Sequence, residues 1–260
     1  MEKINTKLKL SKQKLKSLPF RKIAPNIVTV MALCAGMTAI RYAIMDNWSR
    51  AVFCIFLAAF FDMLDGRVAR MLKGSTKFGA ELDSLSDFLS FGVAPSILMY
   101  NWTMSSLPKF GWFFCLLFPI CGALRLARFN TMLEDETRED YWHNFFVGVP
   151  APAGAALCIL PIMLAFEFPE IDLFKNIWFC GFVMCIVAML MVSQLPTISV
   201  KHMKIPTYML VPLLIIVVFF TTQMFSQPWL ILSIITICYA ISIPFGSVLF
   251  MKAKKAASKI

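Results

Sequence analysis

Long apolar stretches separated by short polar gaps run through nearly the whole chain. A helix that crosses a bilayer needs about 20 mainly apolar residues, because it rises only about 1.5 Å per residue. The polar gaps leave room for about eight such helices. The expected spans are 26–44, a second from 51 into a polar stretch after 62, a third ending near 100, and then 110–126, 150–166, 177–192, 208–222 and 229–250.

The composition supports the same interpretation. Of the 260 residues, 59% are hydrophobic and 15% are charged, and the mean hydropathy is +0.72, values far from those of a soluble domain. We therefore predict an all-α integral membrane protein built as a single bundle of about eight transmembrane helices. Its expected parts are a basic segment over 1–24, the transmembrane domain over 25–251 and a basic tail over 252–260.

The basic residues predict an orientation. Of the 25 lysines and arginines, only Arg41, Arg50, Lys109 and Lys175 fall on the side of an eight-span path opposite the two termini. Because cytoplasmic loops carry the excess of Lys and Arg, we expect both termini to be cytoplasmic in a multi-pass protein of the cell (inner) membrane. The same rule accounts for the basic N-terminal segment, so we expect no nucleic-acid partner.

Four aspartates, Asp62, Asp65, Asp83 and Asp87, interrupt the apolar pattern. An ionised carboxylate is costly in such surroundings unless it meets a cation. On helices, Asp62 and Asp65 share one face, Asp83 and Asp87 share another, and a short turn can bring the two faces together. Mg²⁺ and Mn²⁺ take oxygen ligands of this kind, and two ions about 3.5–4 Å apart would clamp a diphosphate.

Three neighbouring residues strengthen this interpretation. Gly66 and Gly79 have no side chains and leave room for a bulky ligand, while Arg70 offers a planar donor fork for phosphate oxygens. The set therefore predicts a phosphodiester substrate at the cytoplasmic membrane surface. For any one of these residues, a structural role as an ion-pair partner or a helix-packing glycine is the alternative.

The spacing D-x2-D-G-x2-A-R-x8-G-x3-D-x3-D, which starts at Asp62, resembles the signature of the CDP-alcohol phosphatidyltransferase family without a gap or substitution. The resemblance implies two divalent ions, with Asp62 and Asp83 contacting both, Asp65 completing the first site and Asp87 the second. It also makes Asp87 the general base. The implied contacts to CDP-diacylglycerol are Gly66, Ala69, Arg70, Thr76 and Gly79, together with Asn26 and Thr29 of the PNIVT stretch.

Three further segments are similar to family members that use serine as the acceptor: DSLSDFLSFGVAP, CGALRLARFN over 121–130 and FVGVPAPAGA over 146–155. The resemblance implies that the phosphatidyl group of CDP-diacylglycerol passes to the hydroxyl of L-serine, giving phosphatidylserine and CMP, in a homodimer surrounded by membrane lipids. Within the second segment, Arg125 and Arg128 have i, i+3 spacing and suit the serine carboxylate or a lipid phosphate. Alternatively, they are basic anchors at the cytoplasmic end of a span.

Other functions are also compatible with the pattern. A family member could use glycerol 3-phosphate, inositol phosphate or choline as its acceptor. Intramembrane carboxylates also mark ion pathways, so a divalent-cation transporter is a more distant alternative. A pathway would carry polar residues across the whole bilayer, whereas residues 51–61 are uninterrupted apolar sequence.

Overall fold

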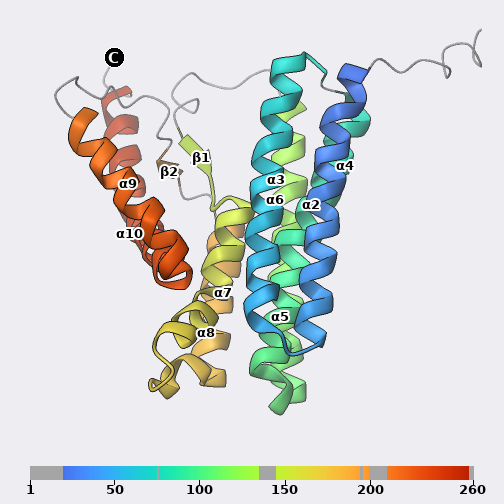
Figure 1. The fold of residues 1–260 in the computed structure, drawn as a ribbon. Coiled ribbons are helices and arrows are strands. Elements are labelled where there is room, and N and C mark those ends of the chain that lie inside the picture. Colours follow the sequence, from blue (N-terminus) through green and yellow to red (C-terminus); the bar gives the residue numbers. More distant parts are fainter. Residues whose placement is uncertain (1–19, 75, 135–144, 194–195, 199–209, 258–260) are drawn as a thin grey trace, which may run out of the picture.

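The computed structural model describes residues 20–74, 76–134, 145–193, 196–198 and 210–257, and within them helices dominate (Figure 1). The first half contains α2 (Phe20–Ile44), α3 (Trp48–Leu72), α4 (Lys77–Asp87), the π-helix η1 (Phe88–Val93), α5 (Ala94–Trp102), the 3₁₀ turn η2 (Met104–Ser106) and α6 (Pro108–Glu134). The second half contains β1 (Phe145–Val147), α7 (Ala151–Glu167), the 3₁₀ turn η4 (Asp172–Lys175), α8 (Ile177–Val192), β2 (Pro196–Ile198), α9 (Leu210–Ser226) and α10 (Pro228–Ala257).

The all-α prediction is confirmed for the described residues, with one addition. The strands β1 and β2 form a short antiparallel pair in which Phe146 lies opposite Thr197. The helices follow the predicted spans closely, although α2, α3 and α6 extend further into polar sequence than expected. Most of the predicted segment 1–24 and the last three residues of the predicted tail lie outside the described residues.

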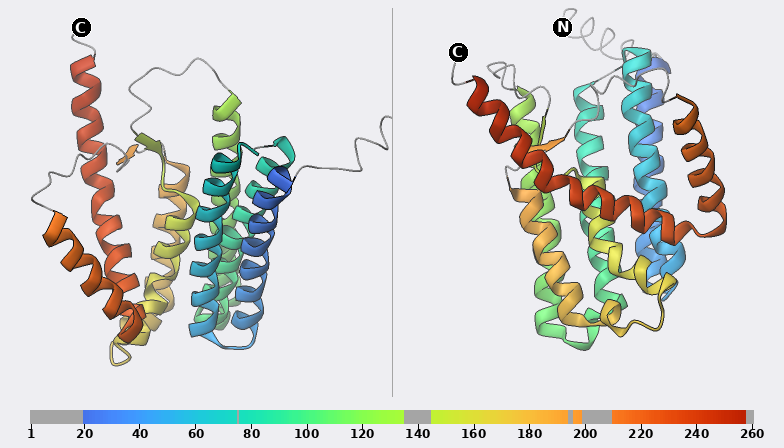
Figure 2. Two further views of the ribbon diagram at one scale, coloured as in Figure 1. Left: turned by 45° about the horizontal axis from the view of Figure 1, so that its top comes forward. Right: turned by 90° about the vertical axis from the view of Figure 1, so that its left-hand side faces the viewer.

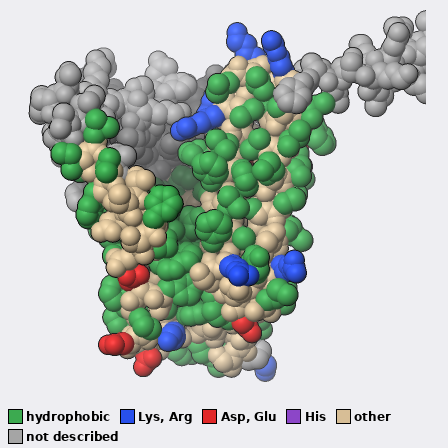
Figure 3. Space-filling model, in the orientation of Figure 1, with side chains coloured by type: hydrophobic (Ala, Val, Ile, Leu, Met, Phe, Trp, Pro, Cys, Tyr) green, Lys and Arg blue, Asp and Glu red, His purple; other side chains and the backbone are tan. Residues whose placement is uncertain are grey.

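Two helical segments among the described residues, Ile23–Ile44 and Lys109–Met132, are both long and apolar enough to cross a membrane. Shorter apolar helices cover Ala151–Glu167, Ile177–Val192, Leu214–Ser226 and Pro228–Pro244. Large hydrophobic side chains are exposed along the bundle (Figure 3), which is the surface expected of a protein solvated by lipid. The number of membrane crossings and their direction stay predictions.

Helices α2, α3 and α6 stand side by side with the continuous rod formed by α4, η1 and α5 (Figure 1). Small residues allow α2 and α3 to approach closely, as is common between membrane helices. The small residues buried in the core are Ala35, Ala39 and Ala43 of α2 and Ala51 and Ala58 of α3. On the other side of the molecule, α10 crosses obliquely over α7, and α9 packs on α10 (Figure 2).

Candidate active site

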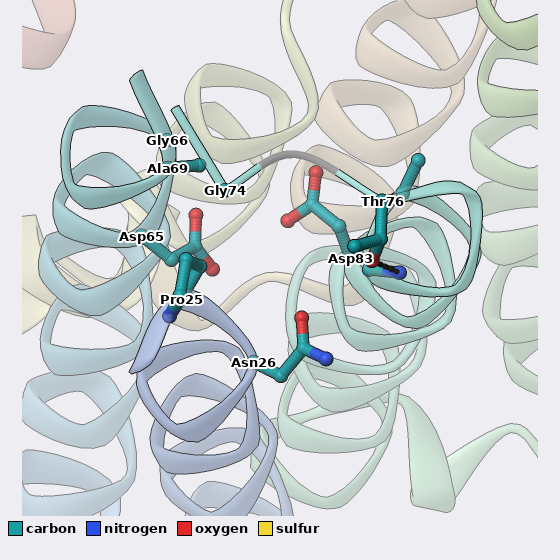
Figure 4. A pocket seen from close by; sticks show the side chains of 10 residues that line it. Pro25, Asn26, Asp65, Gly66, Ala69, Gly74, Thr76 and Asp83 are labelled. Carbon is teal, nitrogen blue, oxygen red and sulfur yellow. Dashed lines mark hydrogen bonds between the residues drawn. The ribbon is translucent and has the colours of Figure 1, made fainter. Parts of the chain in front are cut away.

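The turn between α3 and α4 is fixed by local backbone chemistry. Lys73 ends α3 in the left-handed conformation, with φ 48°, and its N–H bonds to the carbonyls of Ala69 and Arg70. Thr76 then caps α4, because its hydroxyl accepts a hydrogen bond from the N–H of Gly79 at 3.0 Å. Both helices also pack against α2, so the aspartates of α3 and α4 come to lie on either side of the start of α2 (Figure 4).

A cavity of about 140 Å³ lies between these three helices. Asp65 and Asp83 point into it from opposite sides, and Asn26 points into it from α2 (Figure 4). Its full lining is Pro25, Asn26, Asp65, Gly66, Ala69, Gly74, Thr76, Gly79, Ala80 and Asp83. Each of the three helices therefore contributes a polar side chain to the cavity, and small residues on α3 and α4 leave space for it.

Three carboxylates meet beside this cavity. Asp62, Asp83 and Asp87 can each offer an oxygen such that all three atoms lie within 4.8 Å of one another. Asp65 is 5% exposed, and one oxygen each of Asp65 and Asp83 is buried without a hydrogen-bond partner among the described residues. Clustered carboxylates repel one another unless a cation neutralises them. The donor set therefore fits a hard divalent ion, with Asp83 shared between the cluster and the cavity.

Two serines tie α4 and η1 to α2. Ser86 donates to the carbonyl of Thr29 at 3.3 Å, and Ser90 donates to the carbonyl of Ala32 at 3.4 Å. Gly36 makes this approach possible, because a Cβ there would collide with Ser90. The π-helix η1 begins directly after Asp87, and such segments are frequent at functional sites.

The structure separates the predicted nucleotide contacts into two groups. Asn26, Gly66, Ala69, Thr76 and Gly79 line the cavity. Thr29 is buried and donates its hydroxyl to the carbonyl of Pro25 at 3.1 Å, and Arg70 is exposed on α3; neither belongs to the cavity lining. Three lining residues were not predicted: Pro25, Gly74 and Ala80. Each of them lies within two residues of a predicted contact, and this closeness in sequence is the feature that could have indicated them.

The two predicted arginines of α6 differ in their surroundings. Arg128 donates to the carbonyls of Val192 and Ser193, at 2.8 and 3.1 Å. Arg125 instead lies close enough to Asp87 for their charges to interact. The structure thus brings Arg125 toward the carboxylate cluster and joins Arg128 to the end of α8.

The geometry agrees with what comparison with known proteins shows. A family model described as CDP-alcohol phosphatidyltransferase matches residues 22–192, and a second, CDP-alcohol phosphatidyltransferase 2, matches residues 208–244. The chain belongs to the CDP-alcohol phosphatidyltransferase family. The first match contains the whole cavity and all four aspartates, so the family resemblance and the site coincide in space.

Several relatives within the family carry the name CDP-diacylglycerol–serine O-phosphatidyltransferase. The protein from Mycobacterium bovis is 38% identical over 224 residues, which cover 86% of this chain and 78% of the relative. The protein from Helicobacter pylori J99 is 34% identical over 217 residues, covering 84% and 87%. The protein from Bacillus subtilis is 39% identical over 147 residues, covering 54% and 79%.

Gly79 offers a test of the cavity. A Cβ at this position would lie 2.8 Å from Oδ1 of Asn26 and 3.1 Å from Oγ1 of Thr76. Both side chains line the cavity, so we expect Gly79→Ala to displace them and to raise the KM for CDP-diacylglycerol roughly tenfold. Glu81→Gln, at an exposed position of the same helix, is the matched control. An unchanged KM in Gly79→Ala would show that the donor binds elsewhere.

Proposed function

We propose that this chain transfers the phosphatidyl group of CDP-diacylglycerol to the hydroxyl of L-serine, giving phosphatidylserine and CMP. The observation that carries the proposal is the cluster of Asp62, Asp83 and Asp87 at the edge of a cavity held open by glycines. Relatives named for this reaction share 34% and 38% identity with most of the chain and support serine as the acceptor.

The donor fits the cavity by its chemistry. The cytidine diphosphate portion enters between α3 and α4, where Gly66 lets it approach the backbone and Asn26 offers an amide from α2. Gly79 leaves room for Asn26 beside α4. Thr76 adds a hydroxyl at the same wall. Arg70 and Thr29 complete the proposed contacts, Arg70 from the exposed face of α3 and Thr29 by holding the start of α2 in place.

The transfer itself needs a base and a stabilised leaving group. The serine oxygen forms a bond to the phosphorus that carries the diacylglycerol, the bond from that phosphorus to the CMP oxygen breaks, and the hydroxyl proton passes to Asp87. Asp62, Asp65, Asp83 and Asp87 would hold two Mg²⁺ or Mn²⁺ ions. Bound there, the ions supply positive charge that stabilises the departing CMP.

The aromatic residues support the proposed placement of the bundle in the membrane. Trp48, Trp102 and Trp229 meet with Phe166 at the end of the bundle opposite the carboxylate cluster, through ring contacts of 5.2–6.2 Å. Tryptophans gather at membrane interfaces. Asp62 follows Trp48 by fourteen residues, or roughly 21 Å of helix, within a hydrocarbon layer of about 30 Å. This spacing and the basic residues support an active site near the cytoplasmic face of the cell (inner) membrane, in a bundle of about eight spans.

A panel of acceptors tests the proposal. Purified protein is incubated with CDP-diacylglycerol and Mn²⁺ or Mg²⁺, and CMP release is measured with serine, glycerol 3-phosphate, inositol phosphate or choline. We expect release with serine. Release with another acceptor and none with serine would assign the chain to another branch of the family. Metal flux into proteoliposomes without lipid turnover would favour the transporter. The expected homodimer stays a prediction.

A further inference from the structure

Arg128 of α6 makes hydrogen bonds to the backbone of the protein. Its Nη1 donates to the carbonyl of Val192 at 2.8 Å, and its Nη2 donates to that of Ser193 at 3.1 Å. Val192 is the last residue of α8, where carbonyls lack partners within the helix and carry the negative end of its dipole. Arg128 therefore caps α8 and joins it to α6.

The backbone around this cap leaves little space for a substrate. Gly148 has φ +76°, a conformation that favours glycine. A Cβ at Gly148 would lie 2.9 Å from the carbonyl oxygen of Ser193 and 3.5 Å from Nη2 of Arg128. The link between β1 and α7 thus passes directly beside the capped carbonyls, which fits a structural role for Arg128.

Arg125, one turn earlier on α6, has different neighbours. Its guanidinium interacts electrostatically with Asp87 and with Tyr239 of α10, and its Cζ lies 6.0 Å from the ring centroid of Phe129. Its Nε is buried and has no hydrogen-bond partner among the described residues. A buried guanidinium N–H is costly without an acceptor, so this position suits an oxyanion ligand.

Contacts of α6 with α4 and η1 hold Arg125 near Asp87. Nδ2 of Asn130 donates to Oγ of Ser84 at 2.9 Å, so α6 is tied to α4 near Asp83. The helix also packs against η1, which begins directly after Asp87. Arg125 and Asp87 are therefore held on facing helices.

We propose that Arg125 binds the carboxylate of the amino-acid acceptor beside Asp87, and that Arg128 has a structural role and does not touch substrate. The inference rests on the proposed transfer to serine. Serine carries its carboxylate close to its hydroxyl, so a cation next to the base holds the acceptor in the orientation for attack. The interaction of Arg125 with Tyr239 also places α10 near the proposed acceptor site. Helix α10 lies outside residues 22–192, which match the first family model.

The test compares Arg125→Gln, Arg125→Lys and Arg128→Gln in the full-length protein. We expect Arg125→Gln to raise the KM for L-serine roughly 10- to 100-fold and to leave the KM for CDP-diacylglycerol within about threefold of wild type. Arg125→Lys should restore part of the loss, because it keeps the charge and loses the planar fork. Arg128→Gln should lower the thermal unfolding temperature and leave the KM for serine unchanged.

Three results would overturn the inference. In the first, Arg125→Gln raises the KM for CDP-diacylglycerol and spares that for serine, which assigns the guanidinium to the diphosphate of the donor. In the second, Arg125→Gln lowers the unfolding temperature and leaves both KM values unchanged, which makes its role structural. In the third, Arg128→Gln raises the KM for serine as much as Arg125→Gln. Failure of the proposed function is distinguishable, because wild-type protein would then release no CMP with serine.

Discussion

Asp87→Asn is expected to lower kcat by roughly 10²- to 10⁴-fold, the range for loss of a general base. The amide keeps the size of the side chain and one oxygen, but it cannot take the proton of the attacking hydroxyl. We expect binding of CDP-diacylglycerol to change only a few-fold. The measurement is the initial rate of CMP release, paired with the affinity for CDP-diacylglycerol from titration.

Asp46→Asn is the matched control for this substitution. Asp46 is exposed in the turn between α2 and α3, and its φ of 55° is one that asparagine also adopts readily. The control should behave as wild type in both measurements. Near-normal kcat in Asp87→Asn would remove Asp87 from the role of base and leave it as a ligand of the cluster.

Asp62→Ala is expected to weaken cation binding and donor binding together. Three carboxylate oxygens can lie within 4.8 Å of one another, so they repel in the absence of a cation. Removing Asp62 relieves this repulsion, and the metal-free variant should unfold at a temperature no lower than that of wild type. Mn²⁺ at a hundred times its Kd should stabilise wild type by about 2.7 kcal/mol, and this gain should largely disappear in the variant.

Thermal unfolding with and without Mn²⁺, followed by intrinsic fluorescence, measures both effects. Asp172→Ala, at an exposed position in η4, serves as the control and should keep the full response to Mn²⁺. If Asp62→Ala responds to Mn²⁺ as strongly as wild type does, the cluster is not the cation site.

The helical framework was predictable because each helix coincides with an apolar run. The predicted span 177–192 matches α8 at both ends, and 150–166 differs from α7 by one residue at each end. The ends of α3 and α6 were harder to place. There the helix continues through charged sequence, since tertiary contacts rather than hydropathy hold it.

Helical spacing predicted most of the candidate site. It placed Asp83 and Asp87 on one face of α4, and the structure joins both to Asp62. It did not show that Asp65 lies apart from this cluster and faces Asp83 across the cavity. That division depends on how α3 and α4 pack against α2, and hence on contacts such as that of Ser86 with Thr29, which a linear pattern does not contain.

Contacts between residues far apart in sequence also limited the prediction of the site for the acceptor. The i, i+3 spacing made Arg125 and Arg128 equivalent, but only Arg128 reaches the carbonyls of Val192 and Ser193. These residues are 64 and 65 positions away in sequence. The pairing of β1 with β2 was not predicted either. Strands of three residues are too short to show the alternation of apolar and polar residues by which a strand is recognised in a sequence.

A structure of the protein bound to CDP-diacylglycerol and Mn²⁺, with anomalous scattering measured at the manganese edge, tests the central claim most directly. The account predicts manganese bound by Asp62, Asp83 and Asp87, and the cytidine diphosphate portion in the cavity lined by Asn26 and Gly79. Manganese or nucleotide bound at another place, with no density beside these three aspartates, would contradict it.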